Sequence, residues 1–214
     1  MARRRATKVS ASVDRAASIP SATIYRFPFM AIRVQRTVPC RPAAADHPAT
    51  LEVEIVDRQR AVRVPRRAVG RAVRAALARG GVHRGEVSVA IVDDAEIARV
   101  HSRFLNDPTP TDCISFVFDS GNGAIDGEIV VSAETAAVAA RRFGWSASDE
   151  LLLYVAHAAL HLAGYDDQSP AQRRAMRRQE RAVLAELGIC PPRFRRRAAR
   201  SRAAPKRAAQ GRSS

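Results

Sequence analysis

Two histidines four residues apart are the feature of this sequence that points most directly to chemistry. His157 and His161 lie in the segment YVAHAALHLAGYDD, which is mainly apolar apart from them and the closing aspartates. On a helix, side chains at positions i and i+4 project from the same face, one turn apart. Two neutral imidazoles in that arrangement can bind one Zn²⁺, and burying them without a shared partner would be costly. The spacing therefore predicts a zinc site on a helix.

A third ligand is expected directly after this helix. Gly164 follows His161 by three residues, where a glycine in the left-handed conformation can end the helix and turn the chain back. The turn would bring Asp166 or Asp167 round to face the histidines. Asp167 lies six residues after His161, a spacing found in catalytic zinc sites of the H-x3-H-x2-G-x2-ligand type. The predicted ligand set is two histidines and one carboxylate.

Three protein ligands predict a catalytic rather than a closed zinc site. They leave the fourth zinc position open to water, whose pKa the metal lowers towards 7. The pattern therefore favours a metal-dependent hydrolase with one Zn²⁺ per chain. A zinc peptidase normally carries a glutamate directly after the first histidine as general base. Ala158 occupies that position, so a peptidase is the less favoured interpretation.

The segments that must position these residues alternate between strand and helix patterns. A helix is expected from Ser148, as its N-cap, to about Ala163, followed by a last helix from Ser169 to Gly188. The order β-α-β-α-β-β-α-α-α predicts a single α+β domain with a mixed four-stranded sheet and about five helices. The zinc site would lie at the end of the penultimate helix. The preceding elements are expected as strands at 51–56, 86–92, 113–118 and 128–132, and as helices opened by Pro65, by Asp93 and at 133–142.

The composition is that of a chain with one ordinary hydrophobic core. The chain has 214 residues, of which 46% are hydrophobic. No apolar run approaches the roughly 20 residues that span a bilayer, and no apolar stretch near the N-terminus resembles a secretory signal. Cys40, Cys113 and Cys190 are widely separated and odd in number. They are expected to be free thiols in a reducing compartment.

The net charge of +15 is concentrated at the two ends of the chain. Residues 1–50 hold nine basic and two acidic residues, and residues 191–214 hold nine basic and no acidic ones. We expect a disordered basic extension at 1–50, the enzyme domain at 51–189, and a disordered Arg-rich tail at 190–214 that neutralises RNA phosphates. The Arg-rich start also resembles an organellar transit peptide, and Met30 could itself begin a chain.

Three motifs, in this order, resemble those of the YbeY family of bacterial endoribonucleases. PTDCISF (Pro110–Phe116) resembles the family's P-T-D-V-L-S-F, and DGEIVVSAETA (Asp126–Ala136) resembles its L-G-D-I-V-I-S-x-E-T-A. From His157 to Asp167 the chain reads H-A-A-L-H-L-A-G-Y-D-D, where the family has H-G-x-L-H-L-x-G-Y-D-H. The likeness covers about residues 51–188, essentially the whole expected domain.

The resemblance implies a zinc-dependent, single-strand-specific endoribonuclease. Its zinc ligands would be His157, His161 and Asp167, with His157 also counted as the catalytic residue. It implies maturation of the 3′ end of 16S (small-subunit) ribosomal RNA and late ribosome quality control in the cytoplasm. The partners would be single-stranded RNA, ribosomal RNA and the small ribosomal subunit, with no membrane. The alternatives are a non-catalytic RNA-binding ribosome-assembly factor with structural zinc and, less favoured, a metallopeptidase.

The sequence departs from the family pattern at three positions. Asp167 stands where the family usually has histidine, and its negative charge should make a zinc-bound water less acidic. Ala158 replaces glycine, a mild change on a helix. Leu105 stands where the family often has arginine. If that arginine steadies phosphate charge, a nearby cation such as Arg103 must substitute, or activity is weaker.

Other polar residues carry weaker signals. His101 is expected at the surface or in the core of its helix rather than as a ligand. Asp112 and Ser115 would line the cleft by resemblance, although turn formation and strand packing explain them equally well. The run Arg173–Arg181 is expected to be a solvated helix face.

Overall fold

The expected alternation of strands and helices is present in the folded chain. The computed structural model describes residues 50–106 and 108–190. The strands are β1 (Leu51–Asp57), β2 (Arg84–Val92), β3 (Cys113–Gly121) and β4 (Ala124–Ser132). The helices are α1 (Arg66–Ala78), α2 (Asp94–Leu105), α3 (Ala133–Phe143), α4 (Ala147–Leu162) and α5 (Pro170–Glu186). This order confirms the predicted α+β class.

The sheet is mixed, as predicted, with strand order β1-β2-β4-β3. β1, β2 and β4 run parallel, and β3 pairs antiparallel with β4. β3 and β4 form a hairpin whose two turn residues, Asn122 and Gly123, have φ angles of 50° and 74°. An Asn-Gly pair tolerates positive φ at both positions, which a tight hairpin turn requires. The hairpin extends both strands beyond the ranges expected from the apolar pattern alone.

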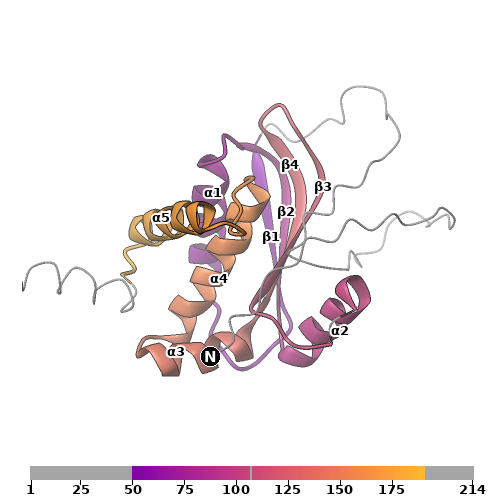
Figure 1. Cartoon of the computed structure of the whole chain (residues 1–214), viewed down its shortest axis with the longest axis vertical. Helices are drawn as coiled ribbons and strands as arrows, with labels where there is room; N and C mark the ends of the chain where they lie inside the picture. Colours follow the sequence, from indigo (N-terminus) through magenta and orange to yellow (C-terminus); the bar gives the residue numbers. More distant parts are fainter. Residues whose placement is uncertain (1–49, 107, 191–214) are drawn as a thin grey trace, which may run out of the picture.

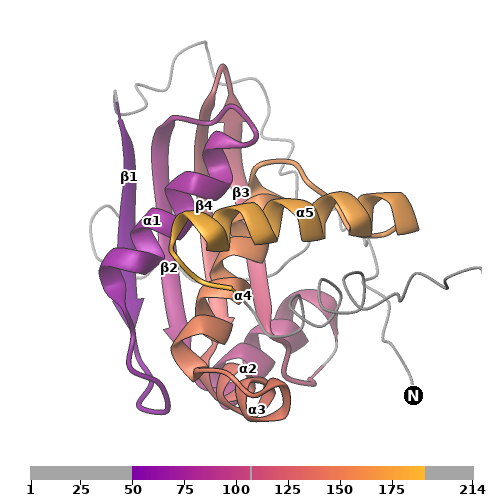
Figure 2. The ribbon, with the colours of Figure 1, turned by 90° about the vertical axis from the view of Figure 1, so that its left-hand side faces the viewer.

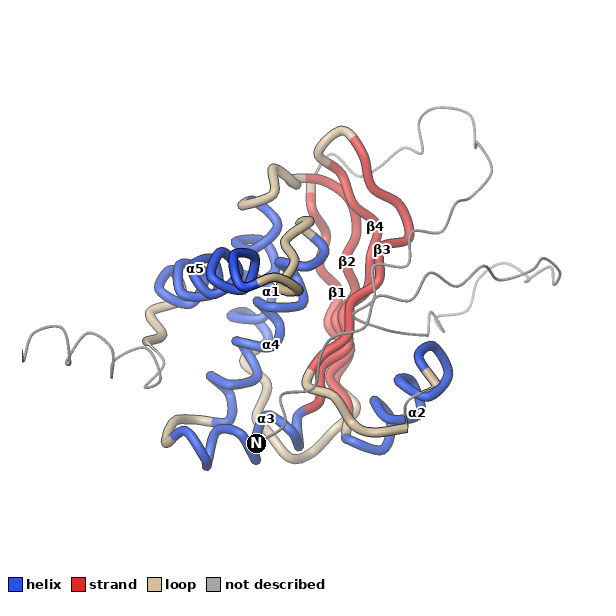
Figure 3. Tube along the Cα trace, viewed as in Figure 1, coloured by secondary structure: helices blue, strands red, loops and turns tan. Residues whose placement is uncertain are grey.

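Helices cover the two faces of the sheet unequally (Figures 1 and 3). One face packs against α1 and α4, and its core includes Leu77, Ile91, Ile129 and Leu160. The other face carries a smaller cluster beneath α2, centred on Ile97. The alternation of apolar residues on β2 and β4 accounts for both, because successive strand residues point to opposite faces. The larger layer is the one that contains the two site histidines.

α4 is the central helix of that layer. Most of its side chains are buried, because the helix contacts α1, α3 and α5 as well as β3 and β4. A helix that is apolar all round is expected in such a position. The predicted cap at Ser148 is wrong: the N-cap is Ser146, whose side chain accepts a hydrogen bond from the backbone N–H of Asp149 at 3.0 Å. Ser148 instead donates to the Arg63 carbonyl at 2.9 Å.

α5 crosses the outer side of α4 and also contacts α1 (Figure 2). Ser169 and Gln172 form a reciprocal capping box at its start, with Pro170 in the first turn. Both features favour a helix beginning at this point. α5 therefore starts only a few residues after the end of α4, and the short connection between them holds the expected carboxylate ligand.

The sequence also led to expectations about the two ends of the chain and about membrane-spanning helices. The extension at 1–50 and the tail at 190–214 lie outside the described residues, except for residues 50 and 190. Within residues 50–106 and 108–190, none of the helices combines the length and apolarity that crossing a bilayer requires.

Candidate metal centre

The site is built at the C-terminal end of α4 and in the turn that follows. His157 and His161 lie on successive turns of the helix, as predicted. Gly164, with φ 92°, reverses the chain, and the Tyr165 N–H donates back to the Leu160 carbonyl at 3.0 Å. The Tyr165 hydroxyl also donates to the Arg79 carbonyl at 3.1 Å, which ties the turn to the end of α1. Because only glycine adopts this backbone conformation readily, the turn depends on having a glycine at position 164.

The turn brings one carboxylate to the two imidazoles. One ligand atom each from His157, His161 and Asp167 lies within 4.8 Å of the other two. Within the described part of the chain, this is the group of histidine, cysteine, aspartate and glutamate side chains that could hold a metal ion. Asp166 points elsewhere: its carboxylate accepts from the Asp167 N–H at 2.7 Å and from the Gln172 amide at 3.4 Å. The geometry thus favours Asp167 over Asp166 as the third candidate ligand, a choice that the predicted turn alone did not make.

The spacing of the two imidazoles fits a shared cation. The Nε2 atoms of His157 and His161 lie 3.1 Å apart, and the rings are nearly perpendicular, at 88°. Two nitrogens bound to one tetrahedral zinc at roughly 2.0–2.1 Å would lie about 3.3 Å apart. Two unprotonated nitrogens facing each other at this distance repel unless a proton or a metal ion lies between them. The donor set of two imidazoles and a carboxylate is one that Zn²⁺ accepts.

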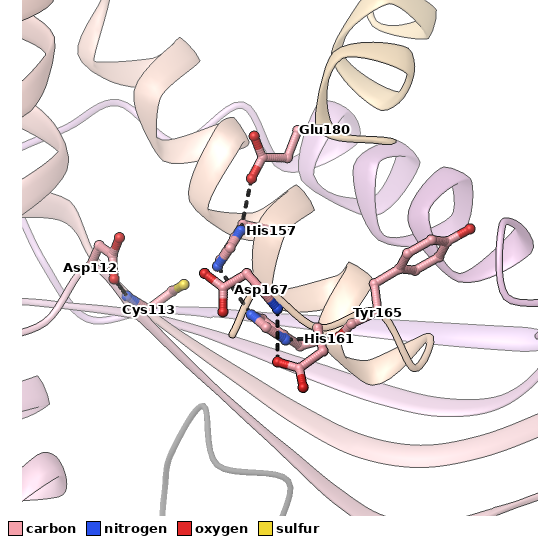
Figure 4. A network of polar contacts seen from close by, with 8 residues as sticks. Asp112, Cys113, His157, His161, Tyr165, Asp167 and Glu180 are labelled. Carbon is pink, nitrogen blue, oxygen red and sulfur yellow. Dashed lines mark hydrogen bonds and ion pairs between the residues drawn. The ribbon is translucent and has the colours of Figure 1, made fainter. Parts of the chain in front are cut away.

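The other nitrogen of each ring has its own partner (Figure 4). His157 Nδ1 lies 2.9 Å from a carboxylate oxygen of Glu180, on α5. His161 Nδ1 lies 3.0 Å from the carbonyl oxygen of Tyr165. Both partners are acceptors, so each Nδ1 carries the proton of the neutral ring and each Nε2 presents its lone pair. These hydrogen bonds prepare both rings to bind a metal through Nε2.

The two histidines differ in their protonation. Burial alone would lower the pKa of His157, but the hydrogen bond and charge of Glu180, with the charges of Asp112 and Asp167, outweigh it and raise the pKa. Burial and the neighbouring His157 lower the pKa of His161. Of the two imidazoles, His157 is therefore the one that is protonated more readily.

α5 also holds the ligand turn. Arg173 donates from one guanidinium nitrogen to the carbonyl oxygens of Asp167, at 3.0 Å, and Gln168. Arg173 therefore departs from the expectation of a solvated arginine face, because the chain turn lies within reach of its side chain. Arg174, Arg177, Arg178 and Arg181 are exposed.

The start of β3 forms another side of the site. The Cys113 thiol is buried, is not disulfide-bonded and points towards His157 and Asp167 (Figure 4). Burial, together with the charges of Asp112, Glu180 and Asp167, raises the pKa of this thiol, so the thiolate form is disfavoured. The Asp112 carboxylate accepts from the Cys113 N–H at 2.9 Å, a local contact with the adjacent residue. Its charge also acts on His157.

The other candidates are not among the residues that make up the metal cluster. His101 Nδ1 contacts the Thr109 carbonyl at 2.7 Å, which supports a structural role in the loop before β3. Ser115 is buried in β3, as strand packing predicts. Arg103 is exposed and lies against the Phe104 ring, with its guanidinium carbon 5.7 Å from the ring centroid. The Leu105 side chain lies outside the described part of the structure.

Glu180 is a site residue that the sequence patterns did not single out. Its signal was present: it lies among the core positions Met176, Val183 and Leu184 of α5, where an acidic residue is out of place unless it has a partner. The apolar spacing of α5 could have marked it as a buried carboxylate. The identity of its partner depended on how α5 crosses α4.

Comparison with known proteins identifies the family. A family model described as Endoribonuclease YbeY matches residues 51–188. Relatives named Endoribonuclease YbeY include those from Rhodopirellula baltica, 46% identical over 117 residues, and Micrococcus luteus, 38% identical over 153 residues. The matches cover 54% and 66% of this chain, and 60% and 96% of the respective relatives. The relative from Alkalilimnicola ehrlichii is 37% identical over 158 residues, with coverage of 70% and 95%. On these matches, the chain belongs to the YbeY family of endoribonucleases, enzymes that act on the phosphodiester bonds of RNA.

Proposed function

We propose that the chain is a zinc-dependent, single-strand-specific endoribonuclease. Its biological role would be maturation of the 3′ end of 16S ribosomal RNA and late ribosome quality control in the cytoplasm. Family membership supports cleavage of RNA. The observation that carries the metal assignment is the 3.1 Å separation of the two histidine Nε2 atoms, with the Asp167 carboxylate beside them.

In this proposal His157, His161 and Asp167 hold the ion. Zinc bound there would polarise a phosphodiester oxygen and lower the pKa of a coordinated water towards 7. Glu180 and the Tyr165 carbonyl keep both Nδ1 protons in place, so both Nε2 lone pairs face the ion. Asp167 adds a negative charge that a histidine would not, which keeps that water less acidic than in a three-histidine site. Either water or the RNA 2′-OH could serve as the nucleophile.

Two other functions are distinguishable from this one. A ribosome-assembly factor with structural zinc would bind RNA and metal but leave the RNA intact. A metallopeptidase would need a general base next to the ion, and Ala158 provides none. The three-residue ligand set favours an open, catalytic site over a closed four-ligand one.

A cleavage assay on purified protein of measured metal content tests the proposal. Zinc-loaded protein should cut a single-stranded RNA spanning the 3′ end of the 16S sequence and spare the same sequence in a duplex. Chelation should abolish cleavage, and stoichiometric zinc should restore it. Cleavage by metal-free protein would reject the metal assignment. RNA and zinc binding without cleavage would support the assembly factor instead.

A further inference from the structure

Glu180 is a carboxylate at a core-facing position of α5. The residue is 9% exposed, and the buried residues around it on the helix are Met176, Val183 and Leu184. A charge in such a place is costly unless another group compensates for it. Its carboxylate oxygen lies 2.9 Å from His157 Nδ1, and Figure 4 shows the side chain pointing at that ring. The hydrogen bond between Glu180 and His157 is therefore part of the packing of α5 against α4.

The contact distinguishes His157 from His161. His161 donates from Nδ1 to a neutral backbone carbonyl, whereas His157 donates to a carboxylate. A carboxylate acceptor fixes the Nδ1–H tautomer more strongly and increases the electron density at Nε2. Of the two imidazoles, His157 should therefore be the stronger metal donor, and the difference should depend on Glu180.

We propose that Glu180 is the positioning residue for metal binding at His157. It fixes the ring's orientation and tautomer from a separate helix and so sets the affinity of the site. This inference rests on the proposed metal site. It assigns Glu180 no contact with RNA or with the reacting atoms.

The anchoring of α5 supports this role. The capping box at Ser169 fixes where the helix begins, and Arg173 hydrogen-bonds the carbonyl of the ligand residue Asp167. One helix therefore orients both a histidine ligand, through Glu180, and the turn that carries the carboxylate ligand, through Arg173. The docking of α5 onto α4 therefore orients two of the three candidate ligands.

A purely structural role for Glu180 makes a different prediction. Removing one partner of a buried pair leaves the other without its hydrogen bond, so Glu180→Leu is expected to lower stability in either case. If Glu180 acts on the metal, Glu180→Leu should weaken zinc binding even in its folded fraction, whatever the change in the stability of the metal-free protein. A structural role alone would lower the stability of the metal-free protein and leave the zinc affinity of its folded fraction unchanged.

The test measures zinc affinity by competition with a chromophoric chelator, in full-length protein. Glu180→Gln keeps an oxygen acceptor for Nδ1 but removes the charge, so we expect an affinity about 10-fold weaker. Glu180→Leu removes both, so the loss should approach about 100-fold. Glu186→Gln is the matched control, because it makes the same change on α5 at an exposed residue whose side chain contacts Arg79. Equal affinities for wild type, Glu180→Gln and Glu186→Gln would overturn the proposal.

Two further readouts separate positioning from other effects. The visible spectrum of the Co²⁺-substituted protein should change in Glu180→Gln and not in Glu186→Gln, because only the former changes the hydrogen-bond partner of a metal ligand. At saturating zinc, kcat should fall in Glu180→Gln while KM for RNA stays within about twofold, since Glu180 does not touch RNA. If KM rises and kcat is unchanged, Glu180 acts on RNA binding, and the proposal is wrong.

A measurement on wild type covers the case in which the variants do not fold. The ring nitrogens of His157 in the zinc-loaded protein can be assigned by ¹⁵N NMR. We expect a protonated Nδ1 and a metal-bound Nε2, and a metal-bound Nδ1 would overturn the proposal. The proposed function fails separately. If the wild-type protein binds no zinc, the proposed metal site is rejected. If it binds zinc without cutting RNA, the proposed function fails and the role of Glu180 in metal binding still stands.

Discussion

The Nε2 atoms of His157 and His161 lie 3.1 Å apart, while each Nδ1 is engaged by a different acceptor. In the metal-free protein, a contact between these two nitrogens requires one shared proton. The pKa of His157 is raised, chiefly because Glu180 outweighs the effect of burial, and the pKa of His161 is lowered by burial and by His157. His157 is therefore the imidazole that takes up a proton more readily, and a proton on its Nε2 would compete with a metal ion for that nitrogen.

Zinc binding should consequently release a proton, and its affinity should depend on pH. A ligand nitrogen must be deprotonated, so below the raised pKa of His157 each zinc should displace about one proton, and the affinity should fall about tenfold per pH unit. Above that pKa the release should approach zero. Isothermal titration in buffers of different ionisation enthalpy measures both quantities. A zinc affinity that is constant between about pH 5 and pH 8 would contradict the shared-proton arrangement.

Gly80, at the end of α1, lies against the end of α4. A Cβ atom at Gly80 would lie 2.4 Å from the carbonyl oxygen of Ala163, the C-cap residue of α4. Gly80→Ala must therefore displace the backbone that leads into the ligand turn. We expect a loss of about 1–3 kcal/mol in the free energy of unfolding, together with weaker zinc binding. Chemical denaturation and chelator competition measure the two effects.

Gly81 is the matched control for this change. It has a φ of 76° and open space around its Cβ position, so Gly81→Ala adds backbone strain without a clash. The strain should cost about 1–2 kcal/mol, and zinc affinity should stay at the wild-type value. If Gly80→Ala and Gly81→Ala reduce zinc affinity equally, the close packing of α1 on α4 does not position the site.

Leu105 offers a gain-of-function test of the departure from the family pattern. If an arginine at this position stabilises phosphate charge in related proteins, Leu105→Arg should raise kcat on single-stranded RNA by about tenfold or more, because a single donor to developing charge can contribute roughly 10²–10³ in rate. Leu105→Gln supplies polarity without the charge and should leave kcat unchanged. An equal kcat for wild type and Leu105→Arg would show that the cation is supplied elsewhere or is not needed.

The Arg-rich segment 191–214 should raise RNA affinity without affecting the metal site. The segment contains nine basic residues and no acidic ones. For each RNA phosphate that the segment neutralises, removing its charge should reduce the slope of log affinity against log salt by about 0.7. A full-length variant with these basic residues changed to glutamine separates charge from chain length. Zinc content and duplex discrimination should not change, and an unaltered salt slope would exclude a phosphate-binding role for the segment.

The order of elements was predictable because the local signals agree with one another. Apolar alternation marked the strands, and Pro65, Asp93 and Ser169 marked helix starts that the structure confirms. The cap of α4 was misplaced because Ser146 and Ser148 both precede acidic residues, and only tertiary contacts decide between them. The Ser148 hydroxyl donates to the carbonyl oxygen of Arg63, on the segment before α1.

The site was predictable where its residues are close in sequence. The i, i+4 histidines and the glycine turn are local, so their positions followed from helix geometry. The choice between Asp166 and Asp167 needed a resemblance or a structure, because either could face the histidines after the turn. Glu180 lies 23 residues from His157. Its role depends on the crossing of two helices, which no local pattern encodes.

Asp167→Ala, compared with Asp166→Asn, decides whether RNA cleavage depends on a metal ion held at this site. Zinc content and cleavage of single-stranded RNA are measured on the same folded samples. We predict that Asp167→Ala loses zinc affinity by more than about 100-fold and loses cleavage with it, with its circular dichroism spectrum unchanged. Asp166→Asn, which keeps the oxygen that accepts from the Asp167 N–H, should retain both properties. A folded Asp167→Ala protein that keeps its zinc and still cuts RNA would contradict metal-dependent cleavage at these three residues.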